Sequence, residues 1–386
     1  MPELSVIIVS YKVRYYIEQC ICSVFRSFPE AQVIVVDNNS SDGSVEFLTD
    51  RFPGVQVIAN PENSGFGKAN NMALDIATGR YVLFLNPDTV VAERTLPACV
   101  EFLDSHPETG CVGVRMQYGD GRFARESRRS LPTPKVSFWH MTGMGRIFPH
   151  SRRFARYHLT YMDQDSPCRI EVASGAFMMV RHDVLARTGG FDEAFFMYGE
   201  DIDLSYRILN EGYENWYLPV PVIHYKGEST NKTSYRYAKV FYDAMQIFFD
   251  KHFHYYSRFF SGVVRLVLAV RKIATFLSQN LKKHAVQEYH EKCLFVGHGS
   301  DFRAASDKIA KSRILVNPVF VECSDMQSVN NAVTENDFGA LVFDVRTFSL
   351  NDIMDYMYGC AQAGVRRTVG LYWPDNDRLI TEDEVL

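Results

Sequence analysis

The sequence predicts an α/β protein with two sheet-containing domains joined by a helical segment. Over roughly the first 80 residues, short runs rich in Val and Ile alternate with amphipathic stretches, a pattern typical of right-handed βαβ units over a mostly parallel sheet. A second alternation of this kind begins near residue 293. The 386 residues, 46% of them hydrophobic, supply enough apolar material for more than one core. We therefore expect domains at 1–236 and 289–386, with a helical segment at 237–288.

Composition and charge exclude several classes of protein. A formal net charge of −5 and a sequence pI of about 6.1 give no footprint of general nucleic-acid binding. The eight cysteines are scattered and form no Cys-x-x-Cys pair, which fits a reducing cytosol better than structural zinc or a disulfide framework. The N-terminus leads almost at once into a strand-like run without the pattern of a signal peptide. We expect a cytoplasmic protein with no nucleic-acid partner.

The first region reads as alternating strands and helices. Helix entries carry polar caps or glycines, most clearly Ser41-Asp42-Gly43-Ser44. The expected strands are Leu4–Val9, Gln32–Val36, Val55–Ile58 and Tyr81–Leu85, and the expected helices are Val13–Phe25, Gly43–Arg51 and Gly67–Ala77.

This periodicity fades between about residues 119 and 168, where arginines and aromatic residues are frequent. Two interpretations are open: a mobile basic excursion, or a solvated loop with ordinary positive charge. A strand-like run returns at Glu171–Val180, a helix is expected from His182, and an acidic segment follows at Gly199.

Residues 237–283 are helical in character, and Phe259–Leu277 is strongly apolar. Arg265, Arg271 and Lys272 interrupt this run, which argues against a membrane-spanning helix because charges at bilayer depth are costly. Basic residues beside Phe, Leu and Val favour a helix lying on an anionic membrane surface. The alternative is an amphipathic helix packed on the first domain or on a dimer partner.

The C-terminal region predicts a small Rossmann-like parallel-sheet domain with strands at Cys293–Val296, Ile314–Val319, Ala340–Val345 and Thr368–Tyr372. Its first turn, at 297–302, has two of the three glycines of a dinucleotide fingerprint and Phe302 at the third position. A structural module with an unused turn fits better than a cofactor site. A nicotinamide oxidoreductase would also need catalytic residues nearby, and none stands out.

Polar residues at strand ends indicate where the chemistry lies. Asn86-Pro87-Asp88 follows the run Tyr81–Leu85, Asp37 follows an earlier strand, and His224 follows an apolar run at 220–223. Oxygen and imidazole groups at one end of a sheet suggest a metal ion that holds a phosphate.

Six short motifs follow one another along the chain. Together they resemble the motifs of the inverting family 2 glycosyltransferases of GT-A fold, especially those of the bacterial rhamnosyltransferase-like branch. The resemblance covers residues 3–235. The motifs are Val9-Ser10-Tyr11, the segment Val36–Ser44, the segment Asn63–Asn71, Asn86-Pro87-Asp88, the segment Gly199–Leu204 and the segment His224–Ser229. The first domain is accordingly expected to be a GT-A nucleotide-sugar-binding domain.

The resemblance implies a set of donor-binding residues. Gly65 and Gly67 would let the backbone approach the ligand at a helix N-terminus that favours an anion. Turn and cap chemistry is the alternative for Asp37 and Asp42. The implied nucleotide-sugar contacts are Ser10, Tyr11, Asp37, Asn39, Asp42, Gly65, Phe66, Gly67, Lys68, Asn71 and Asn86, with Ser174, Gly175 and Ala176 shaping the pocket for donor sugar and acceptor.

Asp88 matches the last carboxylate of the family's Asp-x-Asp metal motif, whereas the first position is Asn86. A Mg²⁺ or Mn²⁺ ion needs only one or two protein carboxylates when the donor diphosphate and water supply the other oxygens. We therefore assign Asp88 and His224 as metal ligands and Asn86 to donor positioning. Because imidazole prefers softer ions, a His224 ligand favours Mn²⁺ but does not exclude Mg²⁺.

Inversion requires a base that takes the proton of the acceptor hydroxyl. By motif position this base is Asp201, with Glu200 in reserve. Like charges so close raise the proton affinity of at least one of them. Asp203 and Arg207, one helical turn apart, are interpreted as a structural pair.

The implied function is metal-dependent transfer of a sugar from a nucleotide diphosphate to a hydroxyl of a cell-surface glycan or lipid-linked oligosaccharide. dTDP-rhamnose and UDP-hexoses are the candidate donors. Arg128 and Arg129 are expected to bind the acceptor, with peripheral contact on the inner membrane face and an oligomer as further options. The rival hypothesis is a catalytically silent nucleotide-sugar-binding or assembly protein.

Overall fold

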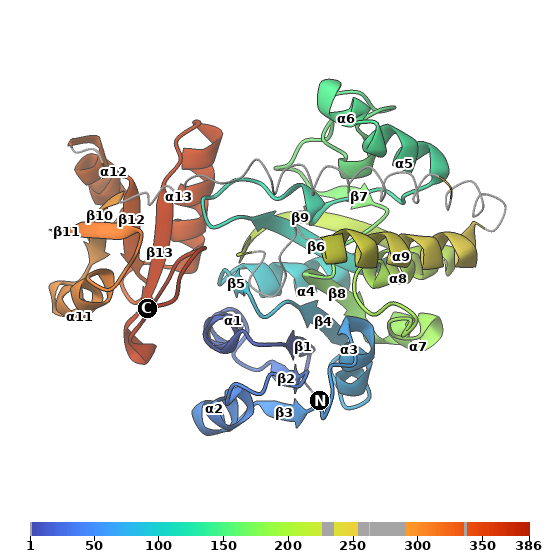
Figure 1. Cartoon of the computed structure of the whole chain (residues 1–386), viewed down its shortest axis with the longest axis horizontal. Helices are drawn as coiled ribbons and strands as arrows, with labels where there is room; N and C mark the ends of the chain where they lie inside the picture. Colours follow the sequence, from blue (N-terminus) through green and yellow to red (C-terminus); the bar gives the residue numbers. More distant parts are fainter. Residues whose placement is uncertain (1, 226–234, 254–261, 263–290, 336–337) are drawn as a thin grey trace.

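A computed structural model describes residues 2–225, 235–253, 262, 291–335 and 338–386 of the chain. Figure 1 shows two sheets with helices packed against them. The larger sheet has the order β3-β2-β1-β4-β8-β6-β9-β5, with β7 paired to β9. Its strands are β1 (Leu4–Ser10), β2 (Gln32–Asp37), β3 (Gln56–Ala59), β4 (Tyr81–Leu85), β5 (Thr89–Val91), β6 (Thr109–Gln117), β7 (Cys168–Ile170), β8 (Phe177–Arg181) and β9 (Glu214–His224).

The first half of this sheet is parallel, as predicted, because β1 pairs in parallel with both β2 and β4. Every residue of β1 and β4 is buried, which explains their continuous apolar sequences. Antiparallel pairs enter where β8 joins β4 and β5 joins β9. The mixed α/β class is therefore confirmed, and the predicted strands lie within one or two residues of the observed ones.

Helices cover this sheet where the sequence places apolar residues at helical spacing. Helix α1 buries Ile17, Cys20, Ile21 and Val24, which share one face at a period of 3.6 residues. The helices of this region are α1 (Arg14–Ser27), α2 (Ser44–Arg51), α3 (Phe66–Leu74), α4 (Thr95–Ser105), α7 (His182–Thr188), α8 (Glu200–Asn210) and α9 (Tyr235–His252).

The predicted strand-like run Glu171–Val180 is corrected. Only Phe177–Arg181 forms a strand, β8, and residues 171–176 form a loop that leads into it. The Phe177 amide donates to the carbonyl of Ser174 at 3.0 Å, which closes a turn at Gly175. The apolar pattern alone could not reveal this turn.

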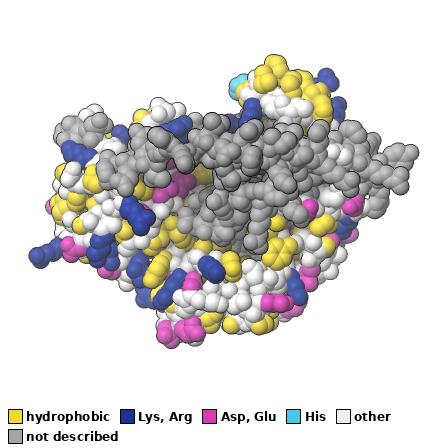
Figure 2. All heavy atoms as spheres, in the orientation of Figure 1, with side chains coloured by type: hydrophobic (Ala, Val, Ile, Leu, Met, Phe, Trp, Pro, Cys, Tyr) yellow, Lys and Arg dark blue, Asp and Glu magenta, His cyan; other side chains and the backbone are white. Residues whose placement is uncertain are grey.

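The basic stretch 119–168 is folded on one side of the large sheet and contains η1 (Arg125–Ser127), α5 (Pro134–Met141), α6 (Met144–Ile147) and η2 (Arg156–His158). Thr133 caps α5 by accepting a hydrogen bond from the Val136 amide, and Pro134 occupies its first turn. Figure 2 shows hydrophobic and basic side chains side by side on the protrusion where Figure 1 places α5 and α6.

The C-terminal sheet has the order β11-β10-β12-β13-β14 and is parallel except for β14. The short antiparallel β14 was not predicted, because three residues after a turn carry too little pattern. The elements are β10 (Glu291–Gly297), α11 (Gly299–Ile309), β11 (Leu315–Glu322), α12 (Met326–Glu335), β12 (Ala340–Asp344), α13 (Leu350–Gln362), β13 (Thr368–Trp373), η3 (Pro374–Asn376) and β14 (Arg378–Ile380).

The two sheets share one interface. Glu93 accepts hydrogen bonds from the amides of Leu350 and Asn351 at 3.0 and 2.9 Å and so caps the N-terminus of α13. Arg94 forms an ion pair with Asp355 at 2.6 Å. A joint apolar cluster includes Tyr16, Val90, Ile223 and Tyr225 from the first region and Phe343, Phe348, Met354 and Trp373 from the second.

Part of the predicted helical segment is observed as α9. Apart from residue 262, the apolar run 259–277, with Arg265, Arg271 and Lys272, lies outside the described residues, as do the motif residues 226–229. Within the described residues, none of the helices combines the length and apolarity needed to cross a membrane.

Candidate functional site

The ends of β1, β2 and β4 meet at one edge of the large sheet, as expected for parallel strands. Asn86, directly after β4, donates its backbone N–H to the carbonyl of Ala176 at 3.0 Å. The neighbouring Gly175 donates its N–H to Asp201 Oδ2, also at 3.0 Å. These two bonds connect the Asn86–Asp88 turn to the start of α8. They bring together residues that the sequence separates by more than a hundred positions.

Asp88 and His224 form a buried pair beside Asn86. Their side chains are 7% and 9% exposed, and Asp88 Oδ1 lies 3.3 Å from His224 Nε2. Asn86 Nδ2 lies 3.3 Å from the same imidazole nitrogen. The pairing of β5 with β9 sets this geometry, because Thr89 is in register with His224.

The pair fits a divalent cation that takes its remaining ligands from substrate and water. A carboxylate oxygen and an imidazole nitrogen 3.3 Å apart are suitable neighbours around one ion. Among the described residues, no group of three or more His, Cys, Asp or Glu side chains is placed to bind a metal. His224 Nδ1 is buried and has no hydrogen-bond partner in the described part of the chain.

Glu200 and Asp201 begin α8, and both are buried, with 6% and 8% of their surface exposed. Gly199 precedes them at φ +84°, where a Cβ would lie 3.1 Å from the Phe195 ring, so glycine is required at this turn. The positive end of the helix dipole favours carboxylates in this first turn.

Both carboxylate oxygens of Asp201 accept hydrogen bonds. Its Oδ2 accepts the Gly175 amide and forms an ion pair with Arg129, and its Oδ1 accepts the Ile202 amide at 2.8 Å. Arg129 is itself largely buried, with 13% of its side chain exposed, and it also donates to the Ala173 carbonyl at 3.3 Å. The aspartate is thus an oriented, ion-paired carboxylate.

Glu200 is a different kind of carboxyl. Burial, followed by the charge of Asp201, raises the pKa of Glu200 well above its usual range. Its Oε2 is buried without a hydrogen-bond partner in the described residues. The two adjacent acids therefore occupy unlike environments, since Asp201 is ion-paired to Arg129 whereas Glu200 is favoured in its neutral form.

Asp203 has a structural role, as predicted. It is fully buried and binds Arg207 at 2.8 Å on the same helix. It also binds Lys251 at 2.8 Å and His252 at 2.6 Å, both on α9. These contacts tie α9 to α8, a connection that spacing along the sequence could not show.

The loop after β2 is held by its own polar side chains. Asp37 accepts the Ser40 amide at 2.9 Å, and Asn38 accepts the side-chain amide of Asn60 at 2.9 Å and donates to Asn63 at 3.0 Å. Asn39 is exposed and has φ +64°. Turn chemistry therefore accounts for much of this motif and leaves Asn39 at the surface.

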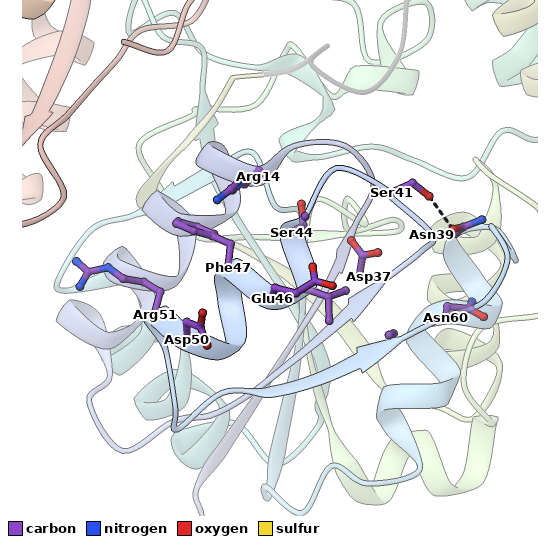
Figure 3. A pocket seen from close by; sticks show the side chains of 13 residues that line it. Arg14, Asp37, Asn39, Ser41, Ser44, Glu46, Phe47, Asp50, Arg51 and Asn60 are labelled. Atoms are coloured by element: carbon purple, nitrogen blue, oxygen red, sulfur yellow. Dashed lines mark hydrogen bonds between the residues drawn. The ribbon is translucent and has the colours of Figure 1, made fainter.

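A cavity of about 990 Å³ lies beside this loop, between β2 and α2. Figure 3 shows Asp37 and Asn60 on the strand side and Arg14 and Phe47 on the helix side. The Arg14 guanidinium lies over the Phe47 ring at 4.4 Å, a planar surface that the sequence did not reveal. Of the predicted nucleotide residues, Asp37 and Asn39 line this cavity, whereas Ser10, Tyr11 and Lys68 do not.

Asp42 accepts the amide hydrogen bond of Ser44, the first residue of α2, at 3.1 Å and does not line the cavity. This contact is of the turn type, one of the alternatives left open for Asp42. Ser10 is buried with an unpartnered hydroxyl among the described residues, and Tyr11 is half-buried.

The loop that contains Gly65 and leads into α3 packs against a second loop, residues 191–196. Gly65 has φ +86°, and a Cβ there would lie 2.5 Å from the Phe196 carbonyl oxygen. Phe66 donates its amide to that same oxygen at 2.8 Å. Gly67 packs on Phe191, and Lys68 is exposed.

Asn71, predicted as a donor contact, hydrogen-bonds to the backbone of another loop. Its side chain donates to the Phe191 carbonyl and accepts the Phe191 amide, each at 2.8 Å, and it is therefore used as a structural bridge. Ser174 and Ala176 flank Gly175 in the loop beside Asp201.

Arg128 also differs from its prediction. It is 2% exposed, donates to the backbone carbonyls of Met162 at 2.6 Å and of Asp163, and lies over the Tyr217 ring at 5.2 Å. Such a buried, occupied guanidinium stabilises the fold and is not available to an acceptor. Arg129 points the other way, toward Asp201, as the alternation of an extended segment requires.

The sequence reasoning missed Tyr157, whose hydroxyl lies beside the Arg129 guanidinium; burial raises the Tyr157 pKa, whereas the charge of Arg129 opposes this rise. Tyr157 stacks on His140 with 4.1 Å between ring centroids. No local motif marks these residues, because they reach the site only through the fold of the 119–168 stretch.

Comparisons with known proteins agree on one family. Residues 5–189 match the model of "Glycosyl transferase family 2". The chain is 26% identical over 282 residues to N-acetylglucosaminyl-diphospho-decaprenol L-rhamnosyltransferase of Mycobacterium tuberculosis, covering 69% of this chain and 91% of that protein. It is 27% identical over 236 residues to rhamnosyltransferase WbbL of Escherichia coli, covering 57% and 82% of the two chains.

Among solved structures, a mannosyltransferase from Pyrobaculum calidifontis in complex with GDP-Man and Mn²⁺ matches with a TM-score of 0.46 at 17% identity, covering 81% of each chain.

Proposed function

We propose that this chain, a family 2 glycosyltransferase similar to rhamnosyltransferases, uses a divalent metal to transfer a sugar, with inversion, from a nucleoside diphosphate to an acceptor hydroxyl. The family match and the curated relatives confirm the resemblance on which the sequence interpretation relied. One observation carries the finer proposal: the Asp88–His224 pair and the Glu200–Asp201 pair are linked through Asn86, Ala176 and Gly175 at one sheet edge.

The nucleoside of the donor would bind beside Asp37 and Asn39. Both line the cavity next to β2, and the Arg14–Phe47 pair offers a flat surface on which a base can stack. Lys68, exposed at the start of α3, is placed to meet phosphate charge near a helix N-terminus. We retain Ser10, Tyr11, Gly65, Phe66 and Gly67 as donor-side residues and remove Asn71.

Asp88 and His224 would hold Mn²⁺ or Mg²⁺, with Asn86 fixing the His224 ring. When bound, the cation neutralises charge that develops on the leaving diphosphate. The low exposure of both side chains strengthens such an interaction by excluding water.

Asp201 would take the proton from the acceptor hydroxyl as the new glycosidic bond forms. Its ion pair with Arg129 and its hydrogen bond from the Gly175 amide keep the carboxylate oriented. Glu200, whose raised pKa favours the neutral form, lowers the charge density beside it. Arg129 is accordingly a positioning residue in place of the acceptor contact predicted from sequence.

The donor is proposed to be dTDP-rhamnose, because two curated relatives are rhamnosyltransferases. UDP-hexoses are the second choice. One of these relatives is named for a diphospho-decaprenol acceptor, and a lipid-linked oligosaccharide or cell-surface glycan is proposed here.

Thermal shift with a panel of nucleotide sugars, with and without Mn²⁺, tests the donor and metal proposals together, since a ligand that binds the native state raises the melting temperature. We expect a shift for dTDP-rhamnose that requires Mn²⁺ and that is lost in Asp88→Asn and His224→Ala. Asp307→Asn, an exposed carboxylate on α11, is the matched control and should behave as the parent. A metal-dependent shift that survives in both site variants would contradict the ligand assignment.

A further inference from the structure

The α5–α6 hairpin, residues 134–148, exposes large apolar side chains to solvent. Phe138 is 50% exposed, Ile147 66% and Phe148 47%. Monomeric soluble proteins rarely gather such residues on one protrusion unless the surface binds something.

These side chains stand on a rigid base. Gly143, at φ +76°, joins the two helices in a left-handed turn, and a Cβ on Gly145 would lie 2.8 Å from the Phe154 carbonyl oxygen. Trp139, which meets Phe138 edge to face at 4.9 Å, also meets Phe154 edge to face at 4.8 Å, and Phe148 meets Phe154 at 5.5 Å. The exposed groups therefore project from a packed aromatic cluster, not from a loose loop.

The charged side chains within this stretch of the sequence have a single sign. No Asp or Glu occurs from residue 127 to residue 162. Lys135, Arg146, Arg152 and Arg153, which lie within the hairpin or shortly after it in the sequence, are exposed, and Figure 2 shows basic and hydrophobic side chains adjoining on this protrusion. The chain as a whole has a net charge of −5, so this is a local basic surface on an acidic protein.

We propose that the α5–α6 hairpin docks on an anionic membrane surface, with Phe138, Ile147 and Phe148 inserted among the lipid headgroups and the basic residues against lipid phosphates. Apolar groups flanked by cations are the combination that an interfacial membrane contact requires. A protein partner with an acidic rim, or a second copy of this acidic chain, would be a different outcome of the test below.

The α5–α6 hairpin is connected to Asp201 through a series of side-chain contacts. His140, near the end of α5, stacks on Tyr157, and the Tyr157 hydroxyl lies beside Arg129, which binds Asp201. On the proposed function, a hairpin seated on the bilayer would therefore bring the head of a lipid-linked acceptor close to Asp201. Membrane docking itself does not depend on that function.

Co-sedimentation with phosphatidylcholine vesicles, with and without phosphatidylglycerol, tests the proposal. The parent chain should bind the anionic vesicles at low salt. The triple variant F138S/I147S/F148S should lose binding by on the order of tenfold or more, and R146Q/R152Q/R153Q should lose the preference for anionic lipid.

Matched controls change similarly exposed residues elsewhere. I76S/V319S/V365S removes apolar groups that are 41%, 36% and 37% exposed, and K311Q/R313Q/R366Q removes exposed charge from the C-terminal domain; both should bind as the parent does. Equal vesicle binding by the parent and F138S/I147S/F148S would overturn the proposal. The proposal would also be overturned if the parent chain did not bind anionic vesicles and light scattering showed an oligomer for the parent but a monomer for F138S/I147S/F148S. Donor-induced thermal shifts, which should persist in all these variants, keep this test separate from that of the proposed function.

Discussion

At the scale of single residues, the site is governed by the unlike surroundings of two neighbouring acids. Asp201 is ion-paired to Arg129, whereas Glu200 is buried with an unpartnered oxygen among the described residues. The sequence showed both carboxylates and their spacing. It could not show which one is paired, because the partner lies 72 positions away.

The role of Arg129 gives a first prediction. Arg129→Gln should lower kcat on the order of 10²-fold with little change in donor KM, because Asp201 loses its orientation. Arg129→Lys should recover part of this loss by keeping the charge. The pH profile of kcat should also shift in the Gln variant, since this change removes the Arg129 charge, which lowers the pKa of the neighbouring Glu200. A purely structural role would lower the melting temperature and leave the pH profile unchanged.

Glu200 gives a second prediction, about stability and pH. Its folded-state pKa is raised by burial to about 8, so the folded protein holds a proton that the unfolded chain releases near pH 4.5. This contribution to stability is complete below the unfolded pKa and is lost as the pH rises toward the folded pKa. Glu200→Gln cannot lose a proton at this position, so its stability does not fall in this way. Its melting temperature relative to that of the parent should therefore rise between about pH 5 and about pH 8. A constant difference across this range would contradict the assignment.

At the scale of elements, the parallel half of the sheet was predictable because β1, β2 and β4 are buried on both faces and have continuous apolar sequences. The 171–176 loop and the α5–α6 hairpin were not, because apolar runs there do not repeat at the period of their final structure. The use of the glycine loop to hold residues 191–196 was equally hidden, since it depends on a contact across the fold.

That contact gives a third prediction. Gly65→Ala should destabilise the protein by about 1–3 kcal/mol, because the residue has φ +86° and its Cβ would collide with the Phe196 carbonyl oxygen. Gly54→Ala is the matched control: no atom lies within 4 Å of its Cβ position, and it should be neutral or slightly stabilising. Urea unfolding of both variants measures the difference. Equal stability of the two would show that the 191–196 loop moves freely.

At the scale of the whole molecule, the C-terminal domain is joined to the first by a buried cluster and by a helix cap contributed from the other domain. Its Rossmann-like pattern was predictable from alternating strands and helices. Its docking was not, since Glu93 and the N-terminus of α13 are more than 250 residues apart.

The cap gives a fourth prediction. Glu93→Ala should destabilise the protein by about 0.5–2 kcal/mol, because the amides of Leu350 and Asn351 lose their acceptor. Glu101→Ala, on the exposed face of α4, is the control and should be close to neutral. Hydrogen exchange of the first turn of α13 should increase in the first variant alone. No change there would mean that water replaces the carboxylate without loss.

We propose that transfer occurs at the sheet edge shared by Asp88, His224 and Asp201, with Asp201 as the base. Single-turnover transfer by Asp201→Asn, with donor binding verified by thermal shift, tests this assignment. We expect intact donor binding and a transfer rate reduced by about 10²–10⁴-fold. Transfer at the parental rate would contradict it.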